Sequence, residues 1–447
     1  MNKDAMLDLQ ARVLTKIKGK MMLLQVQEER MAVVVAALEE VLHEGHDFLG
    51  VDRKAFTKEF LSYGVVEDLL CDAEVEDVII NALKPIYIHH GQKGFIVTDR
   101  KFQSHKELDL FIQKLLVFSG RSGYHKIANL ELPNLAGRVN IIDSPLGPQL
   151  TITKAKVDPL SIINLIKRGG MSYEVAGQLW LYLEGMSIRP ANIIIAGGPG
   201  TGKTTLMNAL FSFIPNQDRM VVIEDTLELN TYLEDSCSRL ATDDELTLSD
   251  LVKNSLRMRP ERIIVGEVRG AEARDMITAV NIGKYCMGTI HALTAREALL
   301  RLHNEPMNVP DSLLNLIDVF VILKRYHVDD KLFRVVDEVS ETSGMENTKI
   351  LLSQVFKYNY DQKRVMPVSP STIYRDRLAH EAGVLPKDII NETWIRAVIL
   401  KTLTEHNVST IKEVSTFCQF YSDNPHEAMA RIGLDRERML KELKARQ

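Results

Sequence analysis

The sequence contains few cysteines and no long apolar run. Its four cysteines lie far apart, with neither a Cys-x-x-Cys pair nor a spacing to histidine that suits zinc, so we expect reduced, buried thiols, as in a cytoplasmic protein. The most apolar run, residues 31–38, is far shorter than the roughly 20 residues that span a bilayer. Residues 1–30 carry charge throughout, which argues against a signal peptide.

An excess of positive charge is also missing. The 55 lysines and arginines are outnumbered by 60 aspartates and glutamates, for a net charge of −5. A dedicated nucleic-acid binder usually carries an evident basic surface, so no direct nucleic-acid partner is expected. The composition, 45% hydrophobic and 26% charged, is that of a globular protein. A chain of 447 residues allows roughly two to four domains.

The hydrophobic pattern divides the chain into successive regions. Strands and helices alternate over residues 172–345, which predicts an α/β domain with a parallel sheet and helices on both faces. The other predicted regions are an N-terminal helical region (1–50), a compact α+β domain (51–155), an interdomain linker (156–171) and a mostly helical C-terminal region (346–447). The first of these is either a helical hairpin on its own domain or a docking arm. The last is either a structural cap or a partner-binding region.

Residues 197–204 form a glycine-rich phosphate loop between a predicted strand and a predicted helix. They read Gly197-Gly198-Pro199-Gly200-Thr201-Gly202-Lys203-Thr204, a full match to G-x-x-x-x-G-K-[S/T]. Such a loop binds phosphate through its backbone N–H groups and the helix N-terminus. We expect Lys203 to reach the β- and γ-phosphates and the Thr204 hydroxyl to ligate Mg²⁺. Thr205 is a further candidate nucleotide-binding residue. The predicted cofactors are therefore ATP and Mg²⁺.

Carboxylates follow two of the other predicted strands. Glu267 ends the apolar run 263–265 and is a candidate for polarising the attacking water. Gly266 stands where many phosphate-loop ATPases place a magnesium-binding aspartate, so the metal must depend on Thr204, water and other carboxylates. Glu224, Asp225 and Glu228 follow the run 221–223 and are candidate catalytic residues, the first two also candidate metal ligands. Asp225 and Glu228 also suit a helix capping box, and both interpretations can hold together.

A histidine and several arginines complete the candidate site. His291 follows the strand 287–290, and its order after Glu267 favours contact with the γ-phosphate or the water, although a lone strand histidine is usually structural. Three arginines around the Glu267 strand are candidates for stabilising phosphate charge: Arg257, Arg259 and Arg269. Three basic residues could contact nucleotide across a domain or subunit boundary, or could be surface charge: Arg138, Lys154 and Arg168.

Together these motifs resemble the motor ATPases of the type II/type IV secretion superfamily, and most closely the branch that assembles tight-adherence (Tad) and archaeal-type pili. The most specific stretches are residues 250–273 and 301–310, and residues 63–70, 75–78 and 137–140 are similar as well. The resemblance covers roughly residues 60–360.

The resemblance implies a RecA-like P-loop NTPase motor domain behind a smaller N-terminal domain, assembled as a ring, usually a hexamer, with ATP between the two domains. It assigns Glu224, Asp225 and Glu228 to the aspartate box, Glu267 to the Walker B glutamate and His291 to the histidine box. Arg138 is the best match to an arginine that reaches the nucleotide from the N-terminal domain. Thr153 departs from the family by standing where an arginine is frequent.

The leading functional hypothesis is a hexameric ATPase motor that powers assembly of a type IV pilus-like filament or a type II secretion-like machine. It would be cytoplasmic, peripheral on the cytoplasmic side of the membrane, and docked on a polytopic inner-membrane platform protein. One alternative is a secretion-channel ATPase for protein or DNA export. The others are a nucleic-acid translocase and an ATP-binding scaffold.

Overall fold

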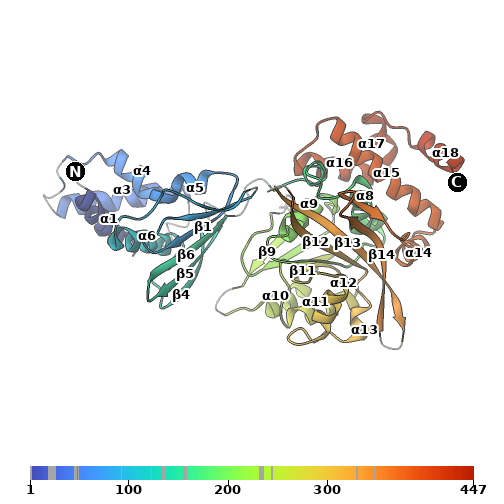
Figure 1. Ribbon diagram of the computed structural model, residues 1–447, viewed down its shortest axis with the longest axis horizontal. Helices are drawn as coiled ribbons and strands as arrows, with labels where there is room; N and C mark the ends of the chain where they lie inside the picture. The colour runs from blue at the N-terminus through green and yellow to red at the C-terminus, as the bar shows by residue number, and fades with distance from the viewer. Residues whose placement is uncertain are drawn as a thin grey trace. The chain divides into compact units, whose positions relative to one another are not determined.

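The chain forms two compact units, each with its own hydrophobic core (Figure 1). The computed structural model describes residues 3–18, 27–44, 48, 50–91, 93–121, 123–132, 137–154, 159–230, 236–242, 245–328, 331–346 and 349–446. The N-terminal unit comprises residues 1–157 with 330–332, and the C-terminal unit comprises residues 158–329 with 333–447. The predicted α/β fold, with a smaller α+β domain and a helical C-terminal region, is confirmed.

A six-stranded sheet forms the centre of the N-terminal unit. Its spatial order is β3 (Gly94–Val97), β2 (Tyr87–His90), β1 (Val75–Asn81), β6 (Gly147–Lys154), β5 (Gly137–Ser144) and β4 (Ile127–Leu132). Neighbouring strands pair antiparallel. Helix α6 (His105–Phe118) begins after Ser104, whose side chain accepts a hydrogen bond from the Glu107 amide, and packs its apolar residues on one face of the sheet.

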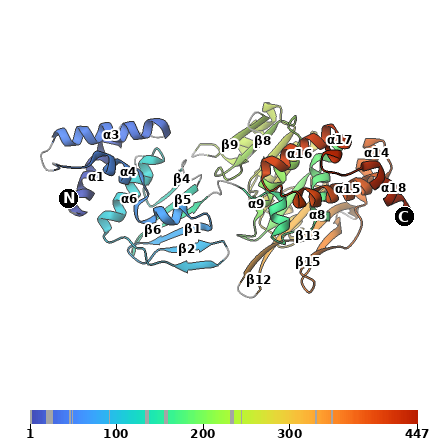
Figure 2. The ribbon, with the colours of Figure 1, turned by 90° about the horizontal axis from the view of Figure 1, so that it is seen from above.

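The N-terminal helices pack within this same unit. They are α1 (Lys3–Ile17), α3 (Gln27–Glu44), α4 (Arg53–Leu61), the short η3 (Gly64–Val66) and α5 (Glu67–Cys71). Leu9 of α1, Leu38 of α3 and Phe60 of α4 share a buried cluster with Phe118 at the end of α6. Figure 2 shows α1, α3 and α4 grouped beside α6. The structure thus has a helical hairpin packed on its own domain, the first of the two interpretations of this region.

A nine-stranded sheet forms the centre of the C-terminal unit. Its spatial order is β15 (Arg364–Pro367), β14 (Lys349–Asn359), β13 (Lys331–Glu346), β12 (Val319–Val328), β7 (Ile193–Gly197), β11 (Tyr285–Ile290), β10 (Arg262–Val265), β8 (Met220–Glu224) and β9 (Cys237–Ala241). The six strands from β12 to β9 run parallel. The residues of β7, β11, β10 and β8 are nearly all buried, which is why these strands read as continuous apolar runs, whereas those of β9 are at most partly buried.

Helices cover both faces of the parallel part of this sheet. Ile193 and Ile195 of β7 pack in one cluster, while Ile194 and Ala196 pack in the other, because successive strand residues point to opposite faces. The first face carries α8 (Tyr173–Glu184), α9 (Lys203–Leu210), α15 (Pro386–Glu405) and α16 (Ile411–Asp423). The second carries α10 (Leu248–Ser255), α11 (Glu272–Asn281), α12 (Ala295–His303) and α13 (Asp311–Leu314) (Figure 1).

Two predicted boundaries differ from the structure. Residues 159–171, expected in a linker, contain α7 (Ile162–Lys167), which starts at a Ser161–Asn164 capping box and buries its isoleucines in the C-terminal unit; residues 156–158 lie outside the described residues. The sheet also continues past residue 345 into β14 and β15, so the helical region begins only at α14 (Ile373–Ala382) and ends with α17 (Pro425–Arg431) and α18 (Arg436–Arg446). Hydrophobic alternation alone did not reveal these two antiparallel strands.

The cysteines are all free thiols, but only two are buried. Cys286 and Cys418 are buried, whereas Cys71 is exposed and Cys237 is partly exposed, so the expectation of buried thiols was wrong for the last two. Among the described helices, none combines the length and the apolar character needed to cross a bilayer.

A buried charge network joins the C-terminal helices to α8. The Arg396 guanidinium on α15 donates to Glu184 on α8 at 2.5 Å and to Glu392 at 3.0 Å, and it lies 4.8 Å from the Trp180 ring centroid. Arg436 on α18 donates to Glu392 at 2.7 Å. Removing one member of such a network leaves an uncompensated buried charge.

We therefore expect Arg396→Ala to destabilise the protein by about 3–5 kcal/mol. Arg438→Ala is the matched control, because Arg438 pairs with Glu442 at the surface and such pairs contribute about 0–1 kcal/mol. Urea unfolding followed by circular dichroism measures both. Equal effects of the two substitutions would contradict the assignment of the network as a stabilising link.

Candidate active site

The candidate residues meet at one edge of the nine-stranded sheet. β7, β11, β10 and β8 are parallel neighbours, with Val265 of β10 opposite Gly288 of β11 and Ile223 of β8. Parallel strands place their carboxyl ends at the same edge, where ligands bind in open α/β sheets. The phosphate loop, Glu224, Glu267 and His291 follow these four strand ends and are therefore brought together.

The phosphate loop joins β7 to α9 through backbone conformations that favour glycine. Gly200 and Gly202 have φ values of +68° and +93°. A Cβ on Gly197 would lie 2.5 Å from the Thr201 hydroxyl oxygen, and that hydroxyl donates to the Gly198 carbonyl at 2.9 Å. The conformation of the loop thus requires the glycines that the sequence motif supplies.

Lys203 lies at the mouth of this loop. Its ammonium donates to the carbonyls of Gly197 at 3.1 Å and Gly198 at 3.2 Å, and lies 3.4 Å from Nδ1 of His291. Burial lowers the pKa of Lys203, an effect that the negative charge of Glu267 opposes. The ammonium is therefore partly desolvated and held where it can exchange backbone carbonyls for phosphate oxygens.

His291 connects Lys203 to Glu267. Nε2 of His291 lies 3.1 Å from Oε1 of Glu267, and both side chains are more than a third exposed. The neighbouring backbone is braced, because the Thr289 hydroxyl donates to the Gly266 carbonyl at 2.6 Å and the Val268 amide donates to the Thr289 carbonyl at 2.7 Å. Ammonium, imidazole and carboxylate thus form one contiguous row that water and a ligand can reach.

The Glu224 side chain is buried inside the turn that follows β8. It is 3% exposed, and its Oε1 accepts hydrogen bonds from the amides of Glu228 and Leu229, each at 2.9 Å. Burial raises its pKa to about 7. Its Oε2 lies 3.7 Å from Arg239 and has no hydrogen-bond partner among the described residues. Glu224 thus braces the turn after β8, so the prediction that it is a direct metal ligand and catalytic group is not supported by its contacts.

The position of Glu224 also explains the glycine at 266. A Cβ on Gly266 would lie 2.9 Å from Cγ of Glu224, closer than real Cβ contacts allow. The aspartate that many phosphate-loop ATPases carry at this point cannot be accommodated here, because the Glu224 side chain fills the space.

Asp225 is engaged by Arg269. The guanidinium of Arg269 donates to Oδ2 of Asp225, and the Thr242 hydroxyl lies 3.3 Å from Oδ1. Residues 225–230 are described and not helical, so Asp225 and Glu228 do not form the capping box. The charge of Asp225 is thus offset by Arg269, and its role as a metal ligand stays a prediction.

The other predicted arginines are not brought to this edge. Arg257 lies in η8 (Leu256–Met258) and Arg259 follows it, both ahead of the amino end of β10. Glu267 follows the opposite end of this four-residue strand, about 13 Å away along its length. The position of the two arginines does not support a role beside Glu267 in the same subunit, and their contact with phosphate stays a prediction. Arg138 lies opposite Thr153 in the N-terminal sheet, and its contact with nucleotide stays a prediction.

Two basic residues at the phosphate loop were missed by the sequence analysis. Nε of Arg334, on β13, donates to the Gly200 carbonyl at 2.9 Å, and a Cβ on Gly200 would lie 2.8 Å from Nη1 of Arg325, on β12. No motif marks either arginine. Both arginines come near the loop because β12 and β13 follow β7 in the spatial order of the sheet. This order exists only in the folded protein.

The donor set at the loop suits magnesium. The Thr204 hydroxyl, in the first turn of α9, makes no hydrogen bond within the described residues, and these residues hold no cluster of three or more His, Cys, Asp or Glu that could bind a metal. Mg²⁺ commonly keeps several waters and takes few protein ligands beside the phosphates, so a single hydroxyl fits this ion.

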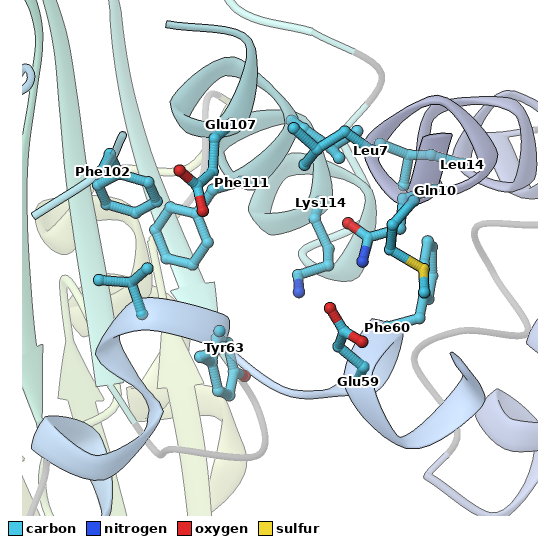
Figure 3. Close-up of a pocket in the computed structure, with 14 residues that line it drawn as sticks. Leu7, Gln10, Leu14, Glu59, Phe60, Tyr63, Phe102, Glu107, Phe111 and Lys114 are labelled. Carbon is cyan, nitrogen blue, oxygen red and sulfur yellow. The ribbon is translucent and has the colours of Figure 1, made fainter. Parts of the chain in front are cut away.

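A separate cavity of about 110 Å³ lies in the N-terminal unit between α1, α4 and α6 (Figure 3). Its walls include Phe60, Phe102 and Phe111, and Lys114 donates to the Ser62 carbonyl beside it. Burial lowers the pKa of Lys114 to about 8. None of the predicted site residues lines this cavity.

Residues 129–335 match the protein family described as "Type II/IV secretion system protein". A probable conjugal transfer protein TrbB of Sinorhizobium fredii is 32% identical over 275 residues, which cover 58% of this chain and 82% of that protein. The chain belongs to this family. The prediction that placed it in the type II/type IV secretion superfamily is confirmed.

The chain is also similar to an archaeal protein and to a solved structure. An uncharacterized protein of Methanocaldococcus jannaschii is 31% identical over 368 residues, which cover 78% of this chain but only 66% of the relative. The X-ray structure of the Legionella pneumophila ATPase DotB is 18% identical, with 74% of this chain and 85% of that chain covered at a TM-score of 0.45.

We expect Glu224→Gln to change how stability depends on pH. Because burial raises the folded pKa of Glu224 above its unfolded value, the stability it contributes is present below about pH 4 and lost as the pH rises through 7. Between pH 5 and pH 8, the free energy of unfolding of the wild type should fall by about 2 kcal/mol more than that of Glu224→Gln. Urea unfolding of both proteins at the two pH values measures this, and parallel pH dependences would contradict the assignment.

We also expect Gly266→Ala to destabilise the protein by about 1–3 kcal/mol, since the new Cβ collides with Cγ of Glu224. In a Glu224→Ala background the same change should cost less than half as much, because the colliding atom is absent. A double-mutant cycle from chemical denaturation measures the coupling. Additive effects would show that Glu224 is not what requires the glycine.

Proposed function

We propose that this protein is an ATP-hydrolysing motor that acts as a homo-oligomer, most simply a hexamer. The observation that carries the proposal is the contiguous row of Lys203, His291 and Glu267 at the mouth of a complete phosphate loop. A loop alone binds phosphate, whereas the row adds a carboxylate and an imidazole beside the place that the γ-phosphate would take.

The chemistry of each residue follows from its position. The loop amides would hold the α- and β-phosphates, Lys203 would reach the β- and γ-phosphates, and the Thr204 hydroxyl would ligate the magnesium ion. When bound, Mg²⁺ would supply positive charge that offsets the charge of the phosphates. Glu267 would orient and polarise a water molecule for in-line attack. His291 touches both Lys203 and Glu267, so it is placed to transmit the presence of the γ-phosphate between them.

We further propose that the motor assembles a type IV pilus-like filament or a type II secretion-like machine, from the cytoplasmic face of the membrane and docked on a polytopic platform protein. The support is the resemblance of residues 250–273 and 301–310 to the pilus branch of the family. The relative named as a conjugal transfer protein favours a second candidate, an export-channel ATPase. Binding to the cytoplasmic loops of a platform protein, tested by co-purification, would favour the filament motor.

The decisive experiment measures ATP hydrolysis per subunit with Mg²⁺ over a wide range of protein concentration. We expect a cooperative rise with concentration and a loss of at least about 100-fold in kcat for Glu267→Gln, because the glutamine cannot polarise the water as a carboxylate does. The control is Glu427→Gln, since Glu427 is exposed and forms an ion pair with Arg431 of its own helix. Unchanged turnover in Glu267→Gln would contradict the assigned role, and binding without turnover in the wild type would favour the scaffold alternative.

A further inference from the structure

Strand β12 brings the cationic side chain of Arg325 to the phosphate loop. β12 pairs with β7 in parallel, and Leu323 lies opposite Gly197, the last residue of β7. Arg325 therefore lies two residues beyond the end of β7, at the level where the loop begins. In the spatial order of the sheet, β12 and β11 are the two neighbours of β7, so Arg325 and His291 approach the loop from opposite sides.

The neighbouring strand holds the loop in place. Nε of Arg334 on β13 donates to the Gly200 carbonyl at 2.9 Å, and a Cβ on Gly202 would lie 3.7 Å from Cδ of Arg334. This bond uses a carbonyl oxygen of the loop and none of its N–H groups, which are the groups that bind an anion. Arg334 and Arg325 thus both lie against Gly200, the first through this hydrogen bond.

Within the part of the chain that the structure describes, Arg325 has no counter-ion. A Cβ on Gly200 would lie 2.8 Å from its Nη1, so the guanidinium rests directly on the loop. Arg325 is exposed, and within the described residues no hydrogen bond or ion pair is formed by its side chain. An unpaired, planar guanidinium with several N–H donors matches a phosphate group geometrically and electrostatically.

The side from which Arg325 approaches indicates which phosphates it meets. Glu267 and His291 face the loop from the β11 side, where the γ-phosphate and the attacking water are expected. The loop amides, to which Gly200 belongs, cradle the α- and β-phosphates. We propose that Arg325 binds the diphosphate part of the nucleotide within its own subunit, the part that ATP and ADP share. This inference rests on the proposed nucleotide binding, but not on hydrolysis.

The test compares Arg325→Ala and Arg325→Lys with the wild type, using the full-length chain. Binding of fluorescent ADP and of a non-hydrolysable ATP analogue gives the two dissociation constants. We expect Arg325→Ala to weaken both by the same factor, about 10- to 100-fold, because a charge-assisted hydrogen bond to a phosphate is lost. KM for ATP should rise while kcat changes less than about twofold, the pattern of lost uniform binding. Arg325→Lys should recover part of the affinity.

Arg364→Ala is the matched control. Arg364 lies on β15, the edge strand of the same sheet, where it donates to Gln362, and three strands separate β15 from β7 and the loop. The nucleotide affinity of this variant should equal that of the wild type, and thermal unfolding without nucleotide should show that every variant is folded. Unchanged ADP affinity in Arg325→Ala would overturn the proposal, as would a loss confined to the ATP analogue or to kcat. A wild type that binds ADP without hydrolysing ATP would contradict the proposed motor. The role of Arg325 could still be tested in that case, because its readout is ADP binding.

Discussion

The parallel pairing of β8, β10, β11, β7 and β12 is the constraint on which the rest of the C-terminal unit depends. It is enforced by burial on both faces, since each strand supplies alternate residues to two separate hydrophobic clusters. A slip of one residue would exchange the two sets of side chains. Because the core sets the register, the carboxyl ends of β7, β8, β10 and β11 lie at the same edge of the sheet. The polar residues at these strand ends therefore lie close together. The site is thus a consequence of the way the core packs.

Crowding at this edge decides how the acidic residues divide their roles. Glu224 turns inward to accept two backbone amides, and its side chain then excludes any residue larger than glycine at position 266. Asp225, one residue later, turns outward and meets Arg269. Glu267 stays accessible and contacts His291. Three carboxylates that look alike in the sequence therefore serve a turn, an ion pair and the candidate chemistry.

The C-terminal helices are joined to the helix that the phosphate loop opens. Trp180 of α8 stacks on Phe213, which follows α9, and also contacts Tyr421 of α16. Arg396 adds charge to this apolar contact through Glu184 and Glu392. A group of helices that could have been a detachable cap is instead part of the same core as α8 and α9. Any displacement of α9 must therefore be accommodated by these contacts.

The sequence by itself determined the alternation of strands and helices, the phosphate loop and the order of Glu267 and His291, because each depends on local spacing along the chain. It also identified the family. Only the tertiary structure decided that Glu224 is a buried brace, that Arg257 and Arg259 lie at the wrong end of β10, and that Arg325 and Arg334 lie at the loop. These outcomes depend on which strands are neighbours and which side chains fill the same space. Such contacts join residues that are distant in the chain, and no local pattern records them.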